Sequence, residues 1–381
     1  MLAAKEVVVL FILISALTNA FLIGKFSKVE LFLYCTLVGI LFISFVHGQF
    51  VLMSVRQLLL LPLLFLTGMV LVLHFQESFE RIAKRSLLFF WIVLFTTYIE
   101  WIVGGGDEWL LRLVNVPEFM IMKEFELWAF GPFGLPGNYY TYDFYSFTGE
   151  TYRRAVSILL EPTLLGQFLV LPVLYFFLQK KYFLSLMFFF GVVLALSKGG
   201  VFTLAMALIY YLYFFVLPKG VRFVVLIGVL LSFILIYELS QALGIQSIIN
   251  HFAGITHNFL YILTSPLGLG VGYSGNFSSL AERAGTIDND VLAGESFVGV
   301  VIGQFGVIGL MLYMMFFRYV WQLEAYSVME KSVKLVALGT LTSAIVSESA
   351  ISFIGGGILF ILLGALAAQQ RMMKKVKNVK K

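Results

Sequence analysis

Charged residues in strongly apolar surroundings are the first candidates for chemistry in this chain. Glu161 stands in "ILLEPTLLGQF", a few residues inside an expected membrane span, and Pro162 follows it. A carboxylate in hydrocarbon costs about 2.5–3.5 kcal/mol on insertion scales, so Glu161 is expected to face a polar cavity or a partner. Pro162 would also leave a carbonyl one turn earlier without its donor. The pair predicts either a functional acid or a hydrogen-bonded residue that holds a helix kink.

Basic residues flank this acid in two motifs. "RRAVSILLEP" places Arg153 and Arg154 at the mouth of the same span, within about two helical turns of Glu161. "LSKGG" places Lys198 at the end of a later span, followed by two glycines that would permit a tight turn. Such cations suit an anionic ligand such as phosphate, and single ones also snorkel to lipid headgroups. The three residues predict either an anion site or interfacial anchoring.

A glycine-rich segment precedes another apolar stretch. "SPLGLGVGYSGN", from Ser265 to Asn276, could bring backbone N–H groups close to a ligand, although its spacing does not match a dinucleotide-binding fingerprint. It is followed by a charged run and then by "ESFVGVVIGQFGVIGL", whose glycines also fit helix packing. The charged residues are Arg283, Asp288, Asp290 and Glu295. A ligand site and a solvated loop above a packing face are both open interpretations.

Other motifs argue against a metal or cofactor. His251 and His257 lack the neighbours and spacing of a zinc site. The sequence also has no G-x-S-x-G elbow and no Walker A motif. We therefore expect no metal and no cofactor.

Aromatic side chains are abundant in the stretch before Arg153. They could stack on sugar faces, and they could equally anchor the chain among lipid headgroups. They are Trp109, Trp128, Phe130, Phe133, Tyr139, Tyr140, Tyr142, Phe144 and Tyr145.

Composition places all of these residues in a membrane protein. The chain has 60% hydrophobic and only 12% charged residues, with a mean hydropathy of +0.96, whereas soluble domains have about 25% charged residues. The lone Cys35 excludes an intrachain disulfide. Much of the net charge of +5 lies in a C-terminal basic tail, residues 371–381, which fits a cytoplasmic end beside anionic lipid better than nucleic-acid binding.

Hydropathy predicts an all-α, polytopic transmembrane bundle of about 11–12 spans in a single membrane domain, residues 1–381. A cleavable signal peptide ending near Ala20 is disfavoured, because its removal would send the basic tail outside. The expected spans are Val7–Ile23, Val29–Val46, Gln57–Phe75, Ser86–Val103, Val156–Leu178, Phe183–Leu196, Gly200–Leu217, Phe223–Ser240, Ser296–Tyr319, Val333–Ser347 and Ile351–Ala368.

Charge sets the expected orientation. With the tail inside, every cytoplasmic turn is basic, as the positive-inside rule requires. The two long connections, residues 104–155 and 241–295, then lie on the extracytoplasmic side. Apolar pieces at 245–249 and 259–263 in the second connection are expected as re-entrant or interfacial helices.

Taken in order, "RRAVSILLEPTLLGQF", "LALSKGG", "SPLGLGVGYSGN" and "ESFVGVVIGQFGVIGL" resemble the O-antigen polymerase and O-antigen ligase superfamily of bacterial membrane glycosyltransferases. The resemblance covers Arg153 to Leu310. It implies a GT-C-like fold in the inner membrane, with the active site facing the periplasm or cell exterior. It also implies metal-independent transfer from an undecaprenyl-diphosphate-linked oligosaccharide, with a chain-length regulator as a possible partner.

The resemblance also implies roles for individual residues. In the family, basic residues near these motifs hold the diphosphate. By position they correspond to Arg153 or Arg154 and to Lys198, and Arg283 is expected to assist. Lysine at 198 replaces a family arginine, so the charge is kept while the bidentate geometry is lost. A second family arginine has no clear equivalent, and His257 is the nearest basic residue.

The general base is expected to be a carboxylate, Glu295 first and Glu161 or Asp290 after it. Ligases carry a His-Asn pair where this chain has Glu295 and Ser296. That departure favours polymerisation of repeat units over ligation of a finished glycan to a lipid or protein acceptor. A lipid-oligosaccharide transporter is the alternative from another functional class.

Overall fold

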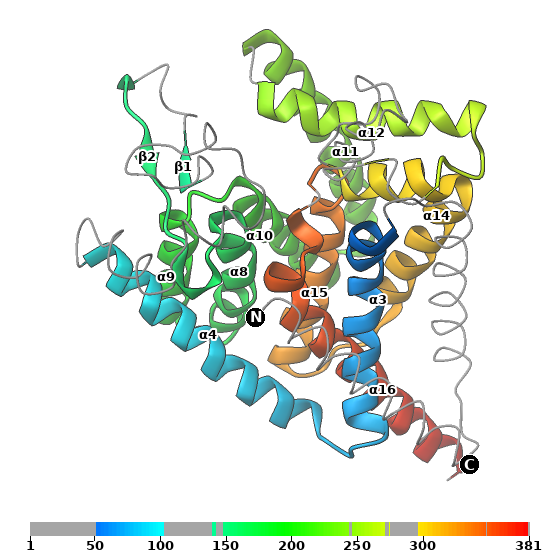
Figure 1. The fold of residues 1–381 in the computed structure, drawn as a ribbon. Coiled ribbons are helices and arrows are strands. Elements are labelled where there is room, and N and C mark those ends of the chain that lie inside the picture. The colour runs from blue at the N-terminus through cyan, green and yellow to red at the C-terminus, as the bar shows by residue number, and fades with distance from the viewer. Residues whose placement is uncertain are drawn as a thin grey trace. The chain divides into compact units, whose positions relative to one another are not determined.

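The computed structural model describes residues 51–102, 139–141, 148–243, 246–270, 274, 296–347 and 349–379, which are mostly helical (Figure 1). The expected spans Val7–Ile23 and Val29–Val46 lie outside them. The main helices are α3 (Val51–Leu73), α4 (Phe79–Ile102), α8 (Pro162–Leu178), α9 (Tyr182–Leu194), α10 (Lys198–Tyr211), α11 (Lys219–Leu243), α12 (Gln246–Thr264), α14 (Phe297–Gln322), α15 (Val328–Ser343) and α16 (Phe353–Val379). Strands β1 (Tyr140–Thr141) and β2 (Tyr152–Arg153), the 3-10 turns Ser157–Leu159 and Ser349–Ile351 and the π-helix Leu212–Val216 complete the order.

Five of the described helical segments are long and apolar enough to cross a membrane. They are Phe79–Ile102, Lys198–Val216, Lys219–Ala242, Phe297–Gln322 and Gly355–Lys374. Shorter apolar helices are Pro62–Leu73, Pro162–Leu178 and Tyr182–Leu194. The chain is therefore a mainly helical, membrane-embedded protein, as its composition predicts. The total of about eleven spans stays a prediction.

The chain forms two compact units, and the smaller one comprises Lys84–Leu204. Its core is aromatic: Trp91 of α4 contacts Phe188 of α9 and Phe176 of α8, with ring centroids 4.9 and 5.9 Å apart. Phe176 and Phe188 also stack on each other at 5.5 Å. Tyr98 adds a hydrogen bond from its hydroxyl to the Met187 carbonyl, 2.7 Å. These contacts hold α4 against the α8–α9 pair.

The larger unit, Met1–Ala83 with Ala205–Lys381, depends on a close crossing of α3 and α16. A Cβ added at Gly68 would collide with the Ile361 carbonyl, and one added at Gly364 would collide with the Phe65 carbonyl. Small residues at such crossings let backbones approach closely, which matters in lipid because water does not drive the helices together.

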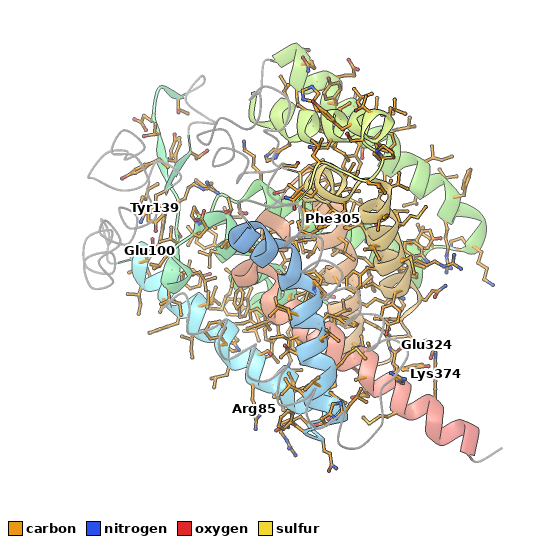
Figure 2. The ribbon with its side chains drawn as sticks, turned by 45° about the vertical axis from the view of Figure 1, so that its right-hand side comes forward. Arg85, Glu100, Tyr139, Phe305, Glu324 and Lys374 are labelled. Atoms are coloured by element: carbon orange, nitrogen blue, oxygen red, sulfur yellow. The ribbon has the colours of Figure 1, made fainter. Side chains whose placement is uncertain are left out.

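Helix α14 breaks at Gly306, whose φ of 57° and ψ of −138° are not helical. Figure 2 labels Phe305, the residue before the break. The glycine-rich segment satisfies the broken backbone: Leu269 and Gly270 donate N–H groups to the carbonyls of Gly303 and Gln304, at 2.8 and 3.2 Å, and the Val307 N–H reaches the Pro266 carbonyl at 2.9 Å. The expectation that this segment offers its N–H groups to a ligand is wrong for Leu269 and Gly270.

The second expected loop contains a 19-residue helix, α12, where the sequence predicts only short apolar pieces. Gly254 packs closely on Gly299 of α14, and Asn258 is buried against Gly303. The opposite face is exposed and largely apolar, with Phe259, Leu260 and Leu263. Helix α16 continues into the basic tail as far as Val379.

The α3–α16 crossing can be tested by adding one methyl group. We expect Gly364→Ala to lower the free energy of unfolding by about 1–3 kcal/mol, because the Cβ meets backbone that cannot move aside cheaply. The measurement is thermal or denaturant unfolding in detergent. Gly228→Ala in α11 is the matched control, since its Cβ would meet nothing within 4 Å. Equal stability of the two variants would contradict this packing.

Candidate anion-binding site

The two expected arginines lie on an extended chain and not on a helix. Strand β2 pairs antiparallel with β1, with Arg153 opposite Tyr140, and the Arg154 N–H donates to the Tyr139 carbonyl at 2.8 Å. Helical turns therefore do not separate Arg153 and Arg154 from Glu161, and the expected start of the span at Val156 is wrong. The helix starts only at Pro162, after the 3-10 turn Ser157–Leu159.

Arg153 forms a buried ion pair with Glu100 of α4. Its Nη2 lies 3.1 Å from Glu100 Oε1, and the two side chains are 16% and 4% exposed. The guanidinium also lies over the Tyr139 ring, 5.1 Å from the centroid, and donates to the Arg154 carbonyl. Figure 2 labels Glu100 and Tyr139 in this region. Through these contacts Arg153 holds the segment around β2 against Glu100 of α4 and against Tyr139.

Glu100 is the main residue that sequence analysis missed. Besides Arg153, its carboxylate accepts the backbone N–H groups of Val156 and Ser157, at 3.0 and 2.6 Å. The sequence does show that Glu100 is an acidic residue near the end of an apolar span, which is the feature that made Glu161 a candidate. Its partners lie more than 50 residues further along the chain, so its role was not readable from local pattern.

Tyr139 is fully buried, and its hydroxyl donates to the Leu160 carbonyl at 2.8 Å. Burial raises its pKa well above the usual value for a phenol, and the nearby Glu161 raises it further, while Arg153 acts in the opposite direction. Tyr139 therefore stays protonated at physiological pH. Because Tyr140 is also buried, neither ring offers a sugar-stacking face; the other aromatic residues named for that role lie outside the described residues.

Glu161 caps α8 and does not lie inside it. Pro162 is the first residue of the helix, where its missing N–H costs nothing, so no carbonyl is freed and the expected kink is absent at this position. The Glu161 carboxylate accepts from the Thr163 hydroxyl at 3.2 Å and is half-buried. A carboxylate at this boundary is far less costly than one in the hydrocarbon.

Lys198 begins α10 and is exposed. The preceding Ser197 hydroxyl accepts the Gly200 N–H at 3.1 Å and donates to the Thr163 carbonyl at 3.2 Å. A Cβ added at Gly200 would lie 2.7 Å from the carbonyl carbon of Gly166. The glycines therefore serve close packing of α8 and α10, and the two helices begin next to each other. Helix starts carry partial positive charge and favour anions.

Arg154 lies beside this junction. Its Nε donates to the Ala195 carbonyl at 3.1 Å, and Ala155 N–H reaches the Leu194 carbonyl at 2.9 Å, so the arginine covers the connection between α9 and α10. Lys198 follows three residues after Ala195. Arg154, Glu161 and Lys198 thus flank one junction, while Arg153 is directed to Glu100.

Three non-glycine residues around the junction adopt left-handed backbone conformations. Ser157, Leu160 and Leu196 have φ values of 54°, 58° and 44°. Side chains other than glycine enter this region only at a cost, which the surrounding contacts must offset. Such strain tends to gather at functional sites, and here it borders both helix starts.

The remaining expected site residues belong to the larger unit. Arg283, Asp290 and Glu295 lie outside the described residues. His257 is exposed on α12, in the other compact unit. Within the described ranges, no three His, Cys, Asp or Glu side chains gather as they would around a metal ion.

Comparisons with protein-family models, curated proteins and solved structures found no match to this chain.

The Glu100 pair generates a stability prediction. Glu100→Gln should lower the free energy of unfolding by about 3–5 kcal/mol, because it leaves the Arg153 charge buried without its counter-ion. Adding Arg153→Met should restore part of this loss. The measurement is a double-mutant cycle, in which unfolding is compared for the wild type, the two single variants and the double variant.

Glu77→Gln is the control for that cycle, since it removes a more exposed ion pair with Arg81. Its effect should stay below about 1 kcal/mol. An additive double mutant would contradict direct coupling between Glu100 and Arg153.

Proposed function

We propose that this chain is a bacterial membrane glycosyltransferase that polymerises undecaprenyl-diphosphate-linked oligosaccharide repeat units into a surface polysaccharide. The observation that carries the proposal is the junction where Arg154 and Lys198 meet the starts of α8 and α10 beside Glu161. Positive charge from two side chains and two helix ends would suit a diphosphate.

A ligand with a long hydrocarbon tail fits the position of this junction. The helices α8 and α10 are strongly apolar, and the junction lies where both begin. A headgroup held there would leave its isoprenoid chain to run along apolar helix surface. A soluble nucleotide sugar would gain nothing from that surface.

The proposed reaction forms one glycosidic bond and breaks one bond to phosphate. An acceptor hydroxyl oxygen attacks the anomeric carbon, the bond from that carbon to the diphosphate oxygen breaks, and the electron pair leaves with the lipid diphosphate. Arg154 and Lys198 stabilise the departing charge. Glu295 was the first expected general base, but Glu161 is the candidate that lies at the junction, so it takes the hydroxyl proton in this proposal, with Glu295 and Asp290 as alternatives.

Arg153 has a different part in this proposal from the one that the resemblance implies. Because its charge is paired with Glu100, it acts as a positioning residue for Arg154 and not as a diphosphate ligand. The proposed roles of Arg283 and His257 in substrate binding rest on the resemblance alone.

The proposed setting follows the resemblance and the charge pattern. The fold would be GT-C-like in the bacterial inner membrane, with residues 104–155 and 241–295 and the active site on the extracytoplasmic side, and with the basic tail inside. The reaction would need no metal or cofactor, and a chain-length regulator would be a partner.

One observation favours a transporter as the second candidate. Helix α14 is interrupted at Gly306, and interrupted helices are typical of secondary transporters of polar substrates. Here the segment Pro266–Gly270 satisfies the interrupted backbone, which gives the break a structural reason as well. Ligation of a finished glycan is the alternative within the glycosyltransferase class.

The test is a reaction of the purified full-length protein in detergent with lipid-diphosphate oligosaccharide as sole substrate. We expect a ladder of longer glycans from the wild type, and a loss of at least a hundredfold in rate for Arg154→Ala and for Lys198→Ala. Arg154→Lys should recover only part, because the ammonium group lacks the planar fork.

Lys181→Ala is the matched control, since Lys181 is exposed at the other end of the α8–α9 pair, and it should keep the wild-type rate. Full activity of both the Arg154 and Lys198 variants would remove the junction from the mechanism. Substrate binding without any ladder would reject polymerisation, and movement of intact substrate across liposomes would then identify a transporter.

A further inference from the structure

Gln167 has an amide group that the fold uses only in part. It lies on α8, is 5% exposed, and its Oε1 accepts a hydrogen bond from the Thr203 hydroxyl at 2.8 Å. Its Nε2 is buried, and no hydrogen-bond partner for it exists among the described residues. Buried donors almost always have partners, so an exception calls for an explanation.

The amide nitrogen lies against the first turn of α10. A Cβ added at Gly199 would be 2.8 Å from Gln167 Nε2, and no other side chain comes as close to that position. Gly199 itself is partly exposed and follows the exposed Lys198. Backbone N–H groups of a first helical turn have no acceptor within their own helix. The unused side-chain donor therefore lies beside the first turn of α10, where the Ser197 hydroxyl accepts the Gly200 N–H.

Two other buried or partly buried glutamines in the described structure use their amide nitrogens. Gln179 Nε2 donates to the Tyr175 hydroxyl at 2.6 Å, and Gln304 Nε2 donates to the Ser274 carbonyl at 3.0 Å. The fold can thus supply acceptors to buried amides. At Gln167 the fold supplies a partner only for the amide oxygen, the donating Thr203 hydroxyl, which directs the nitrogen toward α10.

We propose that Gln167 Nε2 donates a hydrogen bond to an oxygen of a phosphate group held at the start of α10, beside Lys198. This proposal rests on the proposed function and adds a neutral, buried ligand to its anion site. A phosphate has several acceptor oxygens, so it can meet a guanidinium, an ammonium, helix N–H groups and a deeper amide from different directions. Glycine at 199 keeps the path between Gln167 and the ligand open.

The experiment measures binding of undecaprenyl diphosphate to the full-length protein in nanodiscs. Gln167→Glu keeps the size of the side chain and replaces the donor with a carboxylate, so affinity should fall at least tenfold. Gln167→Met removes the donor without adding charge and should cost about three- to tenfold. Gly199→Ala should also weaken binding, because the new methyl group displaces the amide.

Gln179→Glu is the matched control, since it makes the same change at the opposite end of α8, and binding should stay within twofold of the wild type. A pH series adds a readout that a structural role would not move. As the pH falls toward about 5, the carboxyl of Gln167→Glu regains a proton, and the difference from the wild type should shrink.

Two results would overturn the proposal. If folded Gln167→Glu binds as tightly as the wild type, the amide presents its oxygen to α10 and does not donate to the ligand. If folded Gln167→Met loses no affinity, Gln167 is no ligand at all. If binding depends on Gln167 but no glycan ladder forms, the Gln167 site stands and the polymerase activity is rejected. If a ladder forms but binding does not depend on Gln167, the polymerase activity stands and the Gln167 site is rejected. A wild type that binds no diphosphate would reject the anion site itself.

Discussion

The carboxylate of Glu100 is the point on which the smaller unit is organised. A buried charge is costly unless it is paired and hydrogen-bonded, and Glu100 obtains both from residues 153–157, through one guanidinium and two backbone N–H groups. That requirement brings the chain before α8 onto the end of α4. The positions of Arg154 and of the α8 start follow, because both are only a few residues from these contacts.

Adjacent basic residues have different tasks because the backbone between them is extended. Neighbouring side chains on an extended chain point to opposite sides, so one arginine can turn inward while the next turns away. Arg153 turns to Glu100 and Tyr139, and Arg154 turns to the α9–α10 connection. The ion pair thereby neutralises the charge of Arg153, and the extended backbone directs Arg154 toward the junction with Lys198.

Glycines give both units their close helix contacts. Gly68 and Gly364 allow α3 and α16 to cross, Gly166 and Gly200 bring α8 and α10 together, and Gly306 interrupts α14 where another segment satisfies the backbone. In lipid, helix association depends on such close packing, and every backbone group must find a partner within the protein. The same glycines at the α8–α10 contact bring two helix starts together at the junction that carries Lys198 and Glu161.

The sequence by itself determined the membrane class, most helix positions in the described ranges, and the interest of Arg154, Glu161 and Lys198, because hydrocarbon imposes a length on apolar segments and a cost on charges. It could also have placed Pro162 at the start of α8, since proline favours the first helical position. Only the tertiary structure decided that Arg153 is paired with Glu100, that the glycine-rich segment serves α14, and that Gln167 lies under Gly199. Each of these contacts joins residues more than 25 positions apart, and local pattern carries no information about which distant partner neutralises a charge or accepts a hydrogen bond.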